Sequence, residues 1–153
     1  MFLGEFQNTI DEKGRLMIPP VFRDELGSGT LYLTRSTSSC LWLFTEDSFK
    51  ALSRCIDDGS SPKVLFNPTT MNFKRLVINP ARPLCLDKNG RLAIPQELRN
   101  AARINGKDSC AIVGSNKYIE IWNAQVYFSY LDSLNANMNG LTIDEAATSK
   151  WEW

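Results

Sequence analysis

Hydrophobic and polar residues alternate along two short stretches of this chain, which stand 76 positions apart. In the first stretch, positions 6, 8 and 10 alternate with positions 7, 9 and 11, and a less regular alternation follows Gly14. The second stretch, residues 82–94, has a similar layout around Gly90. A period of two is typical of β-strands, and glycine is typical of turns. We therefore expect a strand, a turn and a second strand in each stretch.

Proline, glycine and helix-capping residues divide the rest of the chain into short elements. In the first half, the pattern predicts a helix at 21–26, strands at 30–34 and 41–44, and a helix capped by Thr45. Between the halves it predicts a loop at 57–62 and a helix at 71–76. In the second half it predicts a helix at 96–102, strands at 110–113 and 118–122, and a helix capped by Asn123.

The two alternating stretches belong to a sequence repeat. Residues 10–23 and 86–99 are identical at seven of fourteen positions, where average residue frequencies predict roughly one match. The identical pairs are Asp11/Asp87, Gly14/Gly90, Arg15/Arg91, Leu16/Leu92, Ile18/Ile94, Pro19/Pro95 and Arg23/Arg99. A repeat of this kind predicts two copies of one structural unit.

The repeat extends beyond these fourteen positions, because the helices capped by Thr45 and Asn123 correspond at an offset of 78. The predicted organisation is a first repeat at residues 5–52, a connecting segment at 53–80, a second repeat at 81–134 and a C-terminal tail at 135–153.

Each repeat places an aspartate and an arginine four positions apart across a glycine turn. Asp11 and Arg15, like Asp87 and Arg91, can form a charge-assisted hydrogen bond that closes the turn. The Asn-Gly dipeptide of the second copy is a strong turn signal, because both residues tolerate a positive φ. An isolated pair of this kind is usually a surface ion pair worth at most ~1 kcal/mol. Two copies in one register weaken this interpretation but do not exclude it.

Two groups of residues are expected to be buried. Phe49, Leu52 and Ile56 follow one another at helical spacing after Thr45, which indicates a stripe that faces the core. The four cysteines are widely spaced, and buried free thiols are their default state. They are Cys40, Cys55, Cys85 and Cys110.

The composition excludes several classes of site. The 153 residues include no histidine, which excludes histidine acid–base chemistry, histidine–metal sites and Ser-His-Asp triads. No apolar run reaches the length of a membrane span, and the first residues lack the basic start and long apolar segment of a signal peptide. We therefore expect a soluble cytoplasmic protein with no metal, no cofactor and no small-molecule substrate.

Basic residues are concentrated in the middle of a chain whose net charge is zero. Residues 63–107 contain nine basic and two acidic residues, whereas residues 1–62 and 108–153 are both acidic overall. Such a segment either forms a surface that faces a polyanion or pairs with the acidic flanks in three dimensions. The sequence alone leaves both interpretations open.

Two copies of Asp-x-x-x-Arg-Leu-x-Ile-Pro, in a chain that begins Met-Phe-Leu-Gly-Glu-Phe, closely resemble the MraZ family. A single copy would indicate only the wider AbrB/MazE-like superfamily. The resemblance covers residues 1 to about 134. It implies an α+β, mainly β, fold: a double-split β-barrel of swapped hairpins, formed by two tandem AbrB-like repeats with short helices.

The resemblance also implies a function. MraZ proteins are bacterial regulators of the division and cell-wall gene cluster, so the implied activity is sequence-specific binding of double-stranded DNA at repeated upstream sites, as a repressor. It further implies a ring-shaped homo-oligomer, associated with the nucleoid in the cytoplasm and not with a membrane.

By the family pattern, the Asp-x-x-x-Arg loops form the DNA-binding face. The residues expected to bind DNA are Arg15, Arg91, Lys13 and Lys88. The residues expected to support the loops are Asp11, Gly14, Asp87, Asn89 and Gly90. Lys13 corresponds to Asn89, and Glu12 to Lys88, so the two loops are expected to bind DNA with unequal strength.

Two other classes of function compete with DNA binding. The first is an interaction module that holds a partner protein through residues 135–153, as MazE-like antitoxins do with a flexible C-terminal segment. The second is an enzyme that uses Asp11 and Asp87 as a carboxylate pair. Each aspartate has a nearby arginine that favours its ionised form, and the sequence offers no nucleophile, metal set or phosphate loop, which argues against an enzyme.

Overall fold

The computed structural model of the chain describes residues 1–57 and 61–137. The first half of the chain forms β1 (Glu5–Thr9), β2 (Arg15–Met17), α1 (Pro20–Leu26), β3 (Leu31–Arg35), β4 (Leu41–Thr45) and α2 (Glu46–Ile56). The connecting region forms α3 (Pro62–Leu65), α4 (Pro68–Phe73) and a π-helical segment (Lys74–Ile78). The second half forms β5 (Arg82–Leu84), β6 (Arg91–Ala93), α5 (Gln96–Ala101), β7 (Ser109–Gly114), β8 (Ile119–Asn123) and α6 (Ala124–Asn137). The order β-β-α-β-β-α therefore occurs twice.

Capping residues set the ends of these helices, as the sequence predicted. The Thr45 hydroxyl oxygen accepts a hydrogen bond from the Ser48 amide at 3.3 Å, at the start of α2. The Asn123 side-chain oxygen accepts one from the Gln125 amide at 3.0 Å, at the start of α6. At the end of α1, Gly27 has a φ of 72°, a backbone conformation that glycine adopts without strain.

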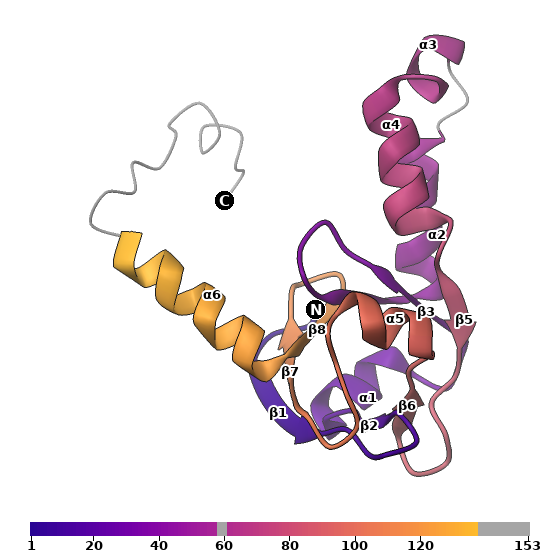
Figure 1. The fold of residues 1–153 in the computed structure, drawn as a ribbon. Helices are drawn as coiled ribbons and strands as arrows, with labels where there is room; N and C mark the ends of the chain where they lie inside the picture. The colour runs from indigo at the N-terminus through magenta and orange to yellow at the C-terminus, as the bar shows by residue number, and fades with distance from the viewer. Residues whose placement is uncertain (58–60, 138–153) are drawn as a thin grey trace.

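The larger sheet is antiparallel and has the strand order β1-β7-β8-β4-β3-β5. The counterparts in the two repeats are β1 and β5, β3 and β7, and β4 and β8. If each strand is replaced by its counterpart, the same order results, read from the opposite edge of the sheet. The two halves are therefore related by a pseudo-twofold axis between β4 and β8. Each repeat places its first strand beside a strand of the other repeat, since β1 pairs with β7 and β5 pairs with β3. Figure 1 shows β1 and β7 side by side near the base of α6.

The second sheet consists of β2 and β6, one strand from each repeat. Leu16 lies directly opposite Leu92 in this antiparallel pair. Two backbone hydrogen bonds continue the pairing past the strands: the Ile18 amide donates to the Gly90 carbonyl at 3.1 Å, and the Ile94 amide donates to the Gly14 carbonyl at 2.9 Å. Each repeat thus holds the turn of the other.

The two strands that flank each turn do not pair with each other as a simple hairpin. β1 and β2 flank a turn, but β1 joins the six-stranded sheet and β2 joins β6. The alternation of residues correctly predicts strands but does not identify their partners, which come from the other repeat. The expected mixed α+β fold with antiparallel sheets is confirmed.

One hydrophobic core lies between the two sheets and includes residues of both repeats. It contains Leu16 and Leu92 from the two-stranded sheet, and Leu43 and Ile121 from the centre of the larger sheet, all fully buried. Phe22 of α1 closes one end, where its ring packs edge-on against Phe2 and Phe6. Because both repeats supply these side chains, neither repeat encloses this core alone.

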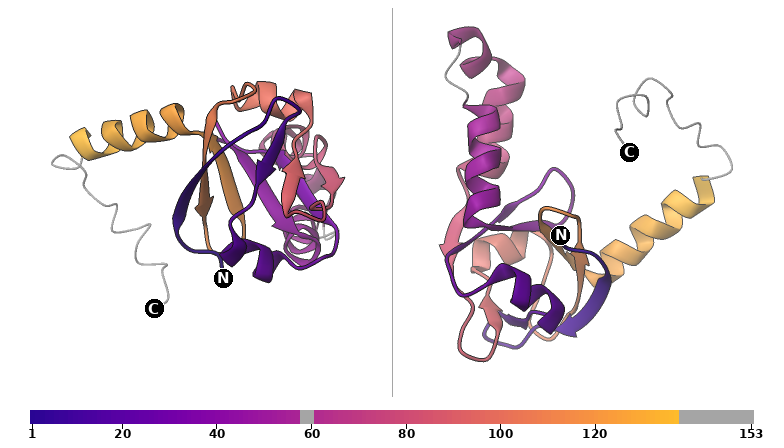
Figure 2. Two further views of the ribbon diagram at one scale, coloured as in Figure 1. Left: turned by 90° about the horizontal axis from the view of Figure 1, so that it is seen from below. Right: turned by 180° about the vertical axis from the view of Figure 1, so that it is seen from behind.

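Two helical segments project from this body. Figures 1 and 2 show that α2, α3 and α4 form an arm on one side and that α6 extends on another. The predicted core stripe on α2 is therefore corrected: no residue of α2 is buried, and Phe49, Leu52 and Ile56 are half-buried. Phe49 stacks on Tyr32 of β3 with ring centroids 4.7 Å apart. Only the start of α2 reaches the sheet, since the helix continues outward beyond it.

The cysteines divide into two groups. Cys40 and Cys110 are buried, and burial raises the pKa of each thiol to about 12. Cys55 and Cys85 are exposed, so the expectation that all four are buried was wrong for these two. Cys55 lies on the projecting α2, and Cys85 directly follows the edge strand β5.

Some predictions fall outside the described residues. These include residues 58–60 of the predicted loop at 57–62, and residues 138–153 of the predicted tail. The alternative of an interaction module that uses this tail falls largely with them. Within residues 1–57 and 61–137, no helix is long and apolar enough to cross a membrane.

Candidate nucleic-acid interface

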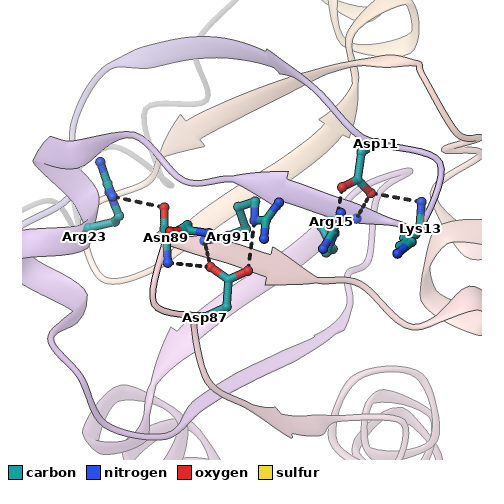
Figure 3. Close-up of polar contacts among 7 residues, drawn as sticks. All are labelled: Asp11, Lys13, Arg15, Arg23, Asp87, Asn89 and Arg91. Carbon is teal, nitrogen blue, oxygen red and sulfur yellow. Dashed lines mark hydrogen bonds and ion pairs between the residues drawn. The ribbon is translucent and has the colours of Figure 1, made fainter.

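The 11–15 loop is organised around the carboxylate of Asp11 (Figure 3). Its Oδ1 accepts hydrogen bonds from the backbone amides of Lys13 and Arg15, at 2.9 and 2.8 Å. Its Oδ2 accepts one from Nε of Arg15 at 2.7 Å. One carboxylate therefore fixes both the turn and the direction of the arginine side chain.

The 87–91 loop repeats this arrangement. Oδ1 of Asp87 accepts from the amides of Asn89 and Arg91, both at 2.9 Å, and Oδ2 accepts from Nε of Arg91, also at 2.9 Å. The predicted bond between aspartate and arginine is present in both copies. Among the described residues, each of these arginine side chains forms its hydrogen bond through Nε alone. The terminal nitrogens of both guanidinium groups therefore remain available as donors.

Glycine is required at the same position of both turns. Gly14 has a φ of 80° and Gly90 a φ of 78°, in the left-handed region where other residues are strained. Each glycine amide donates back to the aspartate carbonyl that begins the turn, at 3.0 Å to Asp11 and 2.9 Å to Asp87. The aspartate, the glycine and the arginine of the motif thus build one turn together.

These hydrogen bonds lower the pKa of both aspartates below the ordinary value of 3.8. The largest cause is the backbone amide of Arg15 for Asp11 and that of Arg91 for Asp87, because a donor to the charged carboxylate favours the charged form. The guanidinium groups act in the same direction, and partial desolvation opposes them. Both carboxylates are therefore ionised at neutral pH.

Replacing Arg91 by alanine is expected to raise the pKa of Asp87 part of the way toward 3.8 and to leave the pKa of Asp11 unchanged. The rise is partial because the backbone amide of residue 91, the largest cause, is retained. Since the pKa of Asp87 is lower in the folded than in the unfolded protein, its ionised carboxylate stabilises the fold at neutral pH. This stabilisation is lost as the pH falls through the pKa of the folded state. Carbon-13 NMR titration of the two carboxyl groups measures the pKa of Asp11 and the pKa of Asp87. An equal rise at Asp11 would contradict independent loops.

Arg15 and Arg91 lie on one outward face of the two-stranded sheet. Side chains alternate between the two faces of a strand. Leu16 and Leu92 point into the core, so Arg15 and Arg91, their neighbours in sequence, point away from it. On this face, the pair of Arg15 and Ala93 is followed by the pair of Met17 and Arg91, so the two arginines lie diagonally across the sheet. The side chains of Arg15 and Arg91 are 34% and 27% exposed, so both are partly accessible from outside.

The other predicted residues lie at the loop tips, and they make the two loops unequal. Lys13, Lys88 and Asn89 are exposed. The 11–15 loop contains two acidic and two basic residues, whereas the 87–91 loop contains one acidic and two basic residues. Glu12 at the first tip forms an ion pair with Lys107 at 2.9 Å. The second loop therefore carries the larger positive charge.

Some basic residues of segment 63–107 pair with acidic residues, and others are left to face a polyanion. Lys74 and Lys107 pair with acidic residues of the first half, at 3.1 Å from Asp57 and 2.9 Å from Glu12. Arg82 pairs within the segment, at 3.2 Å from Glu97. Lys88 and Arg99 form no ion pair among the described residues. Both lie at the surface formed by the 11–15 and 87–91 loops, which we call the two-loop face.

Two further arginines reach this face, and no role was predicted for them. Arg23, near the end of α1, lies against Gly90, and Arg99 of α5 lies against Gly14. Both were visible in the sequence as identical positions of the repeat. Their contacts were not, because each reaches the loop of the opposite repeat. Within the described residues, no cluster of acidic or cysteine side chains is suited to hold a metal ion.

Comparisons with known proteins find relatives over most of the chain. The model of the family described as "MraZ protein", with a likeness to antitoxins, matches residues 1–64 and 77–150. A transcriptional regulator MraZ of Treponema denticola is 42% identical over 128 residues, which cover 84% of this chain and 85% of the relative. The regulator of the same name from Herpetosiphon aurantiacus is 39% identical over 133 residues (87% and 88%), and that of Roseiflexus castenholzii is 37% identical over 137 residues (90% and 91%).

Proposed function

Because the chain belongs to the MraZ family of DNA-binding transcriptional regulators, we propose that it binds double-stranded DNA through the 11–15 and 87–91 loops. Its sites are repeated sequences upstream of the division and cell-wall gene cluster, where it acts as a repressor. As a member of this family, the protein is a regulator and not an enzyme.

The observation that carries this proposal is the pair of outward-facing arginines, each held by its own aspartate. An ordered guanidinium group presents its donors in a fixed geometry, so less conformational entropy is lost when it binds. Arg15 and Arg91 keep their terminal nitrogens available after Nε is bound to Asp11 and Asp87. Such a fork matches the O6 and N7 acceptors of guanine or two oxygens of a phosphate.

The shape of the site supports DNA as the ligand. The major groove of B-form DNA admits a two-stranded β-ribbon, and β2 with β6 forms such a ribbon. Lys13 and Lys88 are exposed at the loop tips, and we propose that they contact phosphates on either side of the groove. We assign the stronger contact to the 87–91 loop, because it lacks the additional carboxylate of Glu12.

The proposal includes the organisation that the family resemblance implies. Two AbrB-like repeats, at 5–52 and 81–134, interlock as a double-split barrel, with a connecting segment at 53–80 and a tail at 135–153. The exchange of β1 and β5 between the repeats and the shared core support this arrangement.

A ring of identical subunits completes the proposal. Phe128, Tyr130 and Leu134 of α6 are exposed, and an apolar groove beside α2 is lined by residues that include Leu52 and Tyr118. We propose that the α6 face of one copy packs against the α2 groove of the next. Head-to-tail contacts of this kind close into a ring when their rotation allows it. Several loop pairs on one assembly would then bind repeated DNA sites with increased avidity.

A mobility-shift titration across a salt series tests this function. The probes are DNA from upstream of the protein's own gene, the same DNA with a single repeat, and a shuffled sequence. We expect binding that increases steeply with the number of repeats and weakens with salt, because phosphate contacts release counterions. Sedimentation of the free protein measures its assembly. Equal affinity for the shuffled DNA would overturn sequence-specific binding, and a monomer would overturn the ring.

A further inference from the structure

Arg23 and Arg99 occupy equivalent positions in the two repeats, and each lies on the loop of the opposite repeat. Arg23 belongs to the first repeat and covers Gly90 of the second. Arg99 belongs to the second repeat and covers Gly14 of the first. The contacts are therefore crosswise, and Figure 3 shows Arg23 beside Asn89 in the 87–91 loop.

Both contacts are close. A methyl group on Gly14 would lie 2.7 Å from Cζ of Arg99, and one on Gly90 would lie 2.9 Å from Cζ of Arg23. Such distances are shorter than van der Waals contact, so each guanidinium group rests directly on the backbone of the turn. Glycine is thus needed at both positions for this approach as well as for its positive φ.

Polar contacts connect each arginine to the link between the repeats. Nη1 of Arg23 donates to the Asn89 carbonyl at 3.5 Å, a long hydrogen bond. Nε of Arg99 donates to the Ile94 carbonyl at 2.9 Å, and the Ile94 amide donates to the Gly14 carbonyl. Neither arginine forms an ion pair in the described part of the chain. The side-chain hydrogen bonds of both arginines go to backbone carbonyls: Arg23 binds that of Asn89 in the 87–91 loop, and Arg99 binds that of Ile94, directly after β6.

We propose that Arg23 and Arg99 are crosswise positioning residues: Arg23 holds the 87–91 loop, and Arg99 holds the 11–15 loop, in the geometry that meets DNA. The aspartate and glycine of each loop fix the turn internally, but they do not fix where it lies relative to the other turn. That placement depends on contacts between the repeats. A binding group needs such supporting contacts to keep its geometry.

The DNA-binding test of this inference rests on the proposed function. It is a double-mutant cycle in which mobility shift measures the affinity of each variant for DNA. Arg23→Ala alone is expected to weaken DNA binding about five- to thirty-fold, the factor that corresponds to roughly 1–2 kcal/mol of binding free energy. Added to Arg91→Ala, it should have little further effect, because both changes act on one loop. Added to Arg15→Ala, it should keep its full effect. Arg99→Ala should show the reverse pattern. Arg54→Ala, on exposed α2, controls for the lost charge.

Two outcomes of this cycle would overturn crosswise positioning. If Arg23→Ala weakened binding equally in both backgrounds and lowered the salt slope by about one, Arg23 would be a direct phosphate contact instead. Unchanged binding in Arg23→Ala would leave it without a role. Arg23→Lys, which keeps the stem and the charge but not the planar group, is the second variant if alanine impairs folding. Positioning predicts that lysine does not restore binding.

A measurement without DNA separates this inference from the proposed function. The Nε–H resonances of Arg15 and Arg91 report the hydrogen bonds to their aspartates in nitrogen-15 NMR spectra. Arg23→Ala is expected to shift or broaden the resonance of Arg91 and leave that of Arg15 unchanged, and Arg99→Ala to do the opposite. If these shifts appear but the wild-type protein binds no DNA, only the proposed function fails. If neither resonance responds, the crosswise inference fails whatever the DNA result.

Discussion

Replacing Arg15 and Arg91 together by alanine is expected to lower the affinity for operator DNA by about 100-fold or more, while the protein stays folded. Each lost guanidinium contact is worth roughly 1–3 kcal/mol of binding free energy, and assembly would multiply the loss over several subunits. Asp11 and Asp87 keep their bonds from backbone amides, so both turns remain in place. Mobility-shift titration at fixed salt measures the affinity, and circular dichroism checks the fold.

A charge-matched variant makes this result specific. Lys50→Ala with Arg54→Ala also removes two positive charges, but both residues are exposed on the projecting α2, and neither is among the residues that line the groove beside it. This control should retain binding within a few-fold, as expected when only long-range electrostatic attraction is reduced. The proposed interface is wrong if the arginine variant binds DNA like the wild type, or if the control loses as much affinity.

Leu16→Ala is expected to lower the free energy of unfolding by about 2–5 kcal/mol, the range for removing a buried leucine side chain. Leu16 is fully buried and lies opposite Leu92, where the two-stranded sheet meets the core. The large loss follows because the cavity opens at the contact between the two repeats. Urea unfolding followed by circular dichroism, at one protein concentration, measures the change.

The adjacent residue supplies the matched control. Met17 follows Leu16 in β2, points to the opposite face and is 37% exposed. Met17→Ala should therefore change the free energy of unfolding by only about 0.5 kcal/mol, as is usual for surface positions. Similar losses in both variants would mean that the faces of β2 are not assigned correctly, and the outward direction of Arg15 would then lose its support.

The repeat and its turns were predictable because their signals are local. An aspartate that accepts hydrogen bonds two and four residues ahead needs only the residues of its own loop. The same holds for a Thr45 or Asn123 cap, whose partner lies two or three residues away. Such contacts form within a few residues of chain, whatever the rest of the molecule does, and the sequence pattern therefore indicates them directly.

Strand partners and burial were less predictable because they depend on residues far away in the chain. The alternation around Phe6 predicts a strand but not that Gln7 pairs with Ala111. The spacing of Phe49 and Leu52 predicts an apolar helix face, but only the fold shows that α2 leaves the body and exposes Cys55. Arg23 and Arg99 stood out as repeated residues, but their helices had to be placed before either reached a glycine of the other repeat.

The sequence by itself determined that this chain contains one unit twice, each with a turn in which an aspartate and an arginine stand four positions apart. The tertiary structure alone decided that the two arginines lie on one outward face, at opposite ends of the sheet formed by β2 and β6. The physical reason is that neither copy can pair its first two strands and bury its apolar face alone. Each repeat pairs its strands with those of the other and shares its core. That exchange brings Arg15 and Arg91 onto neighbouring strands.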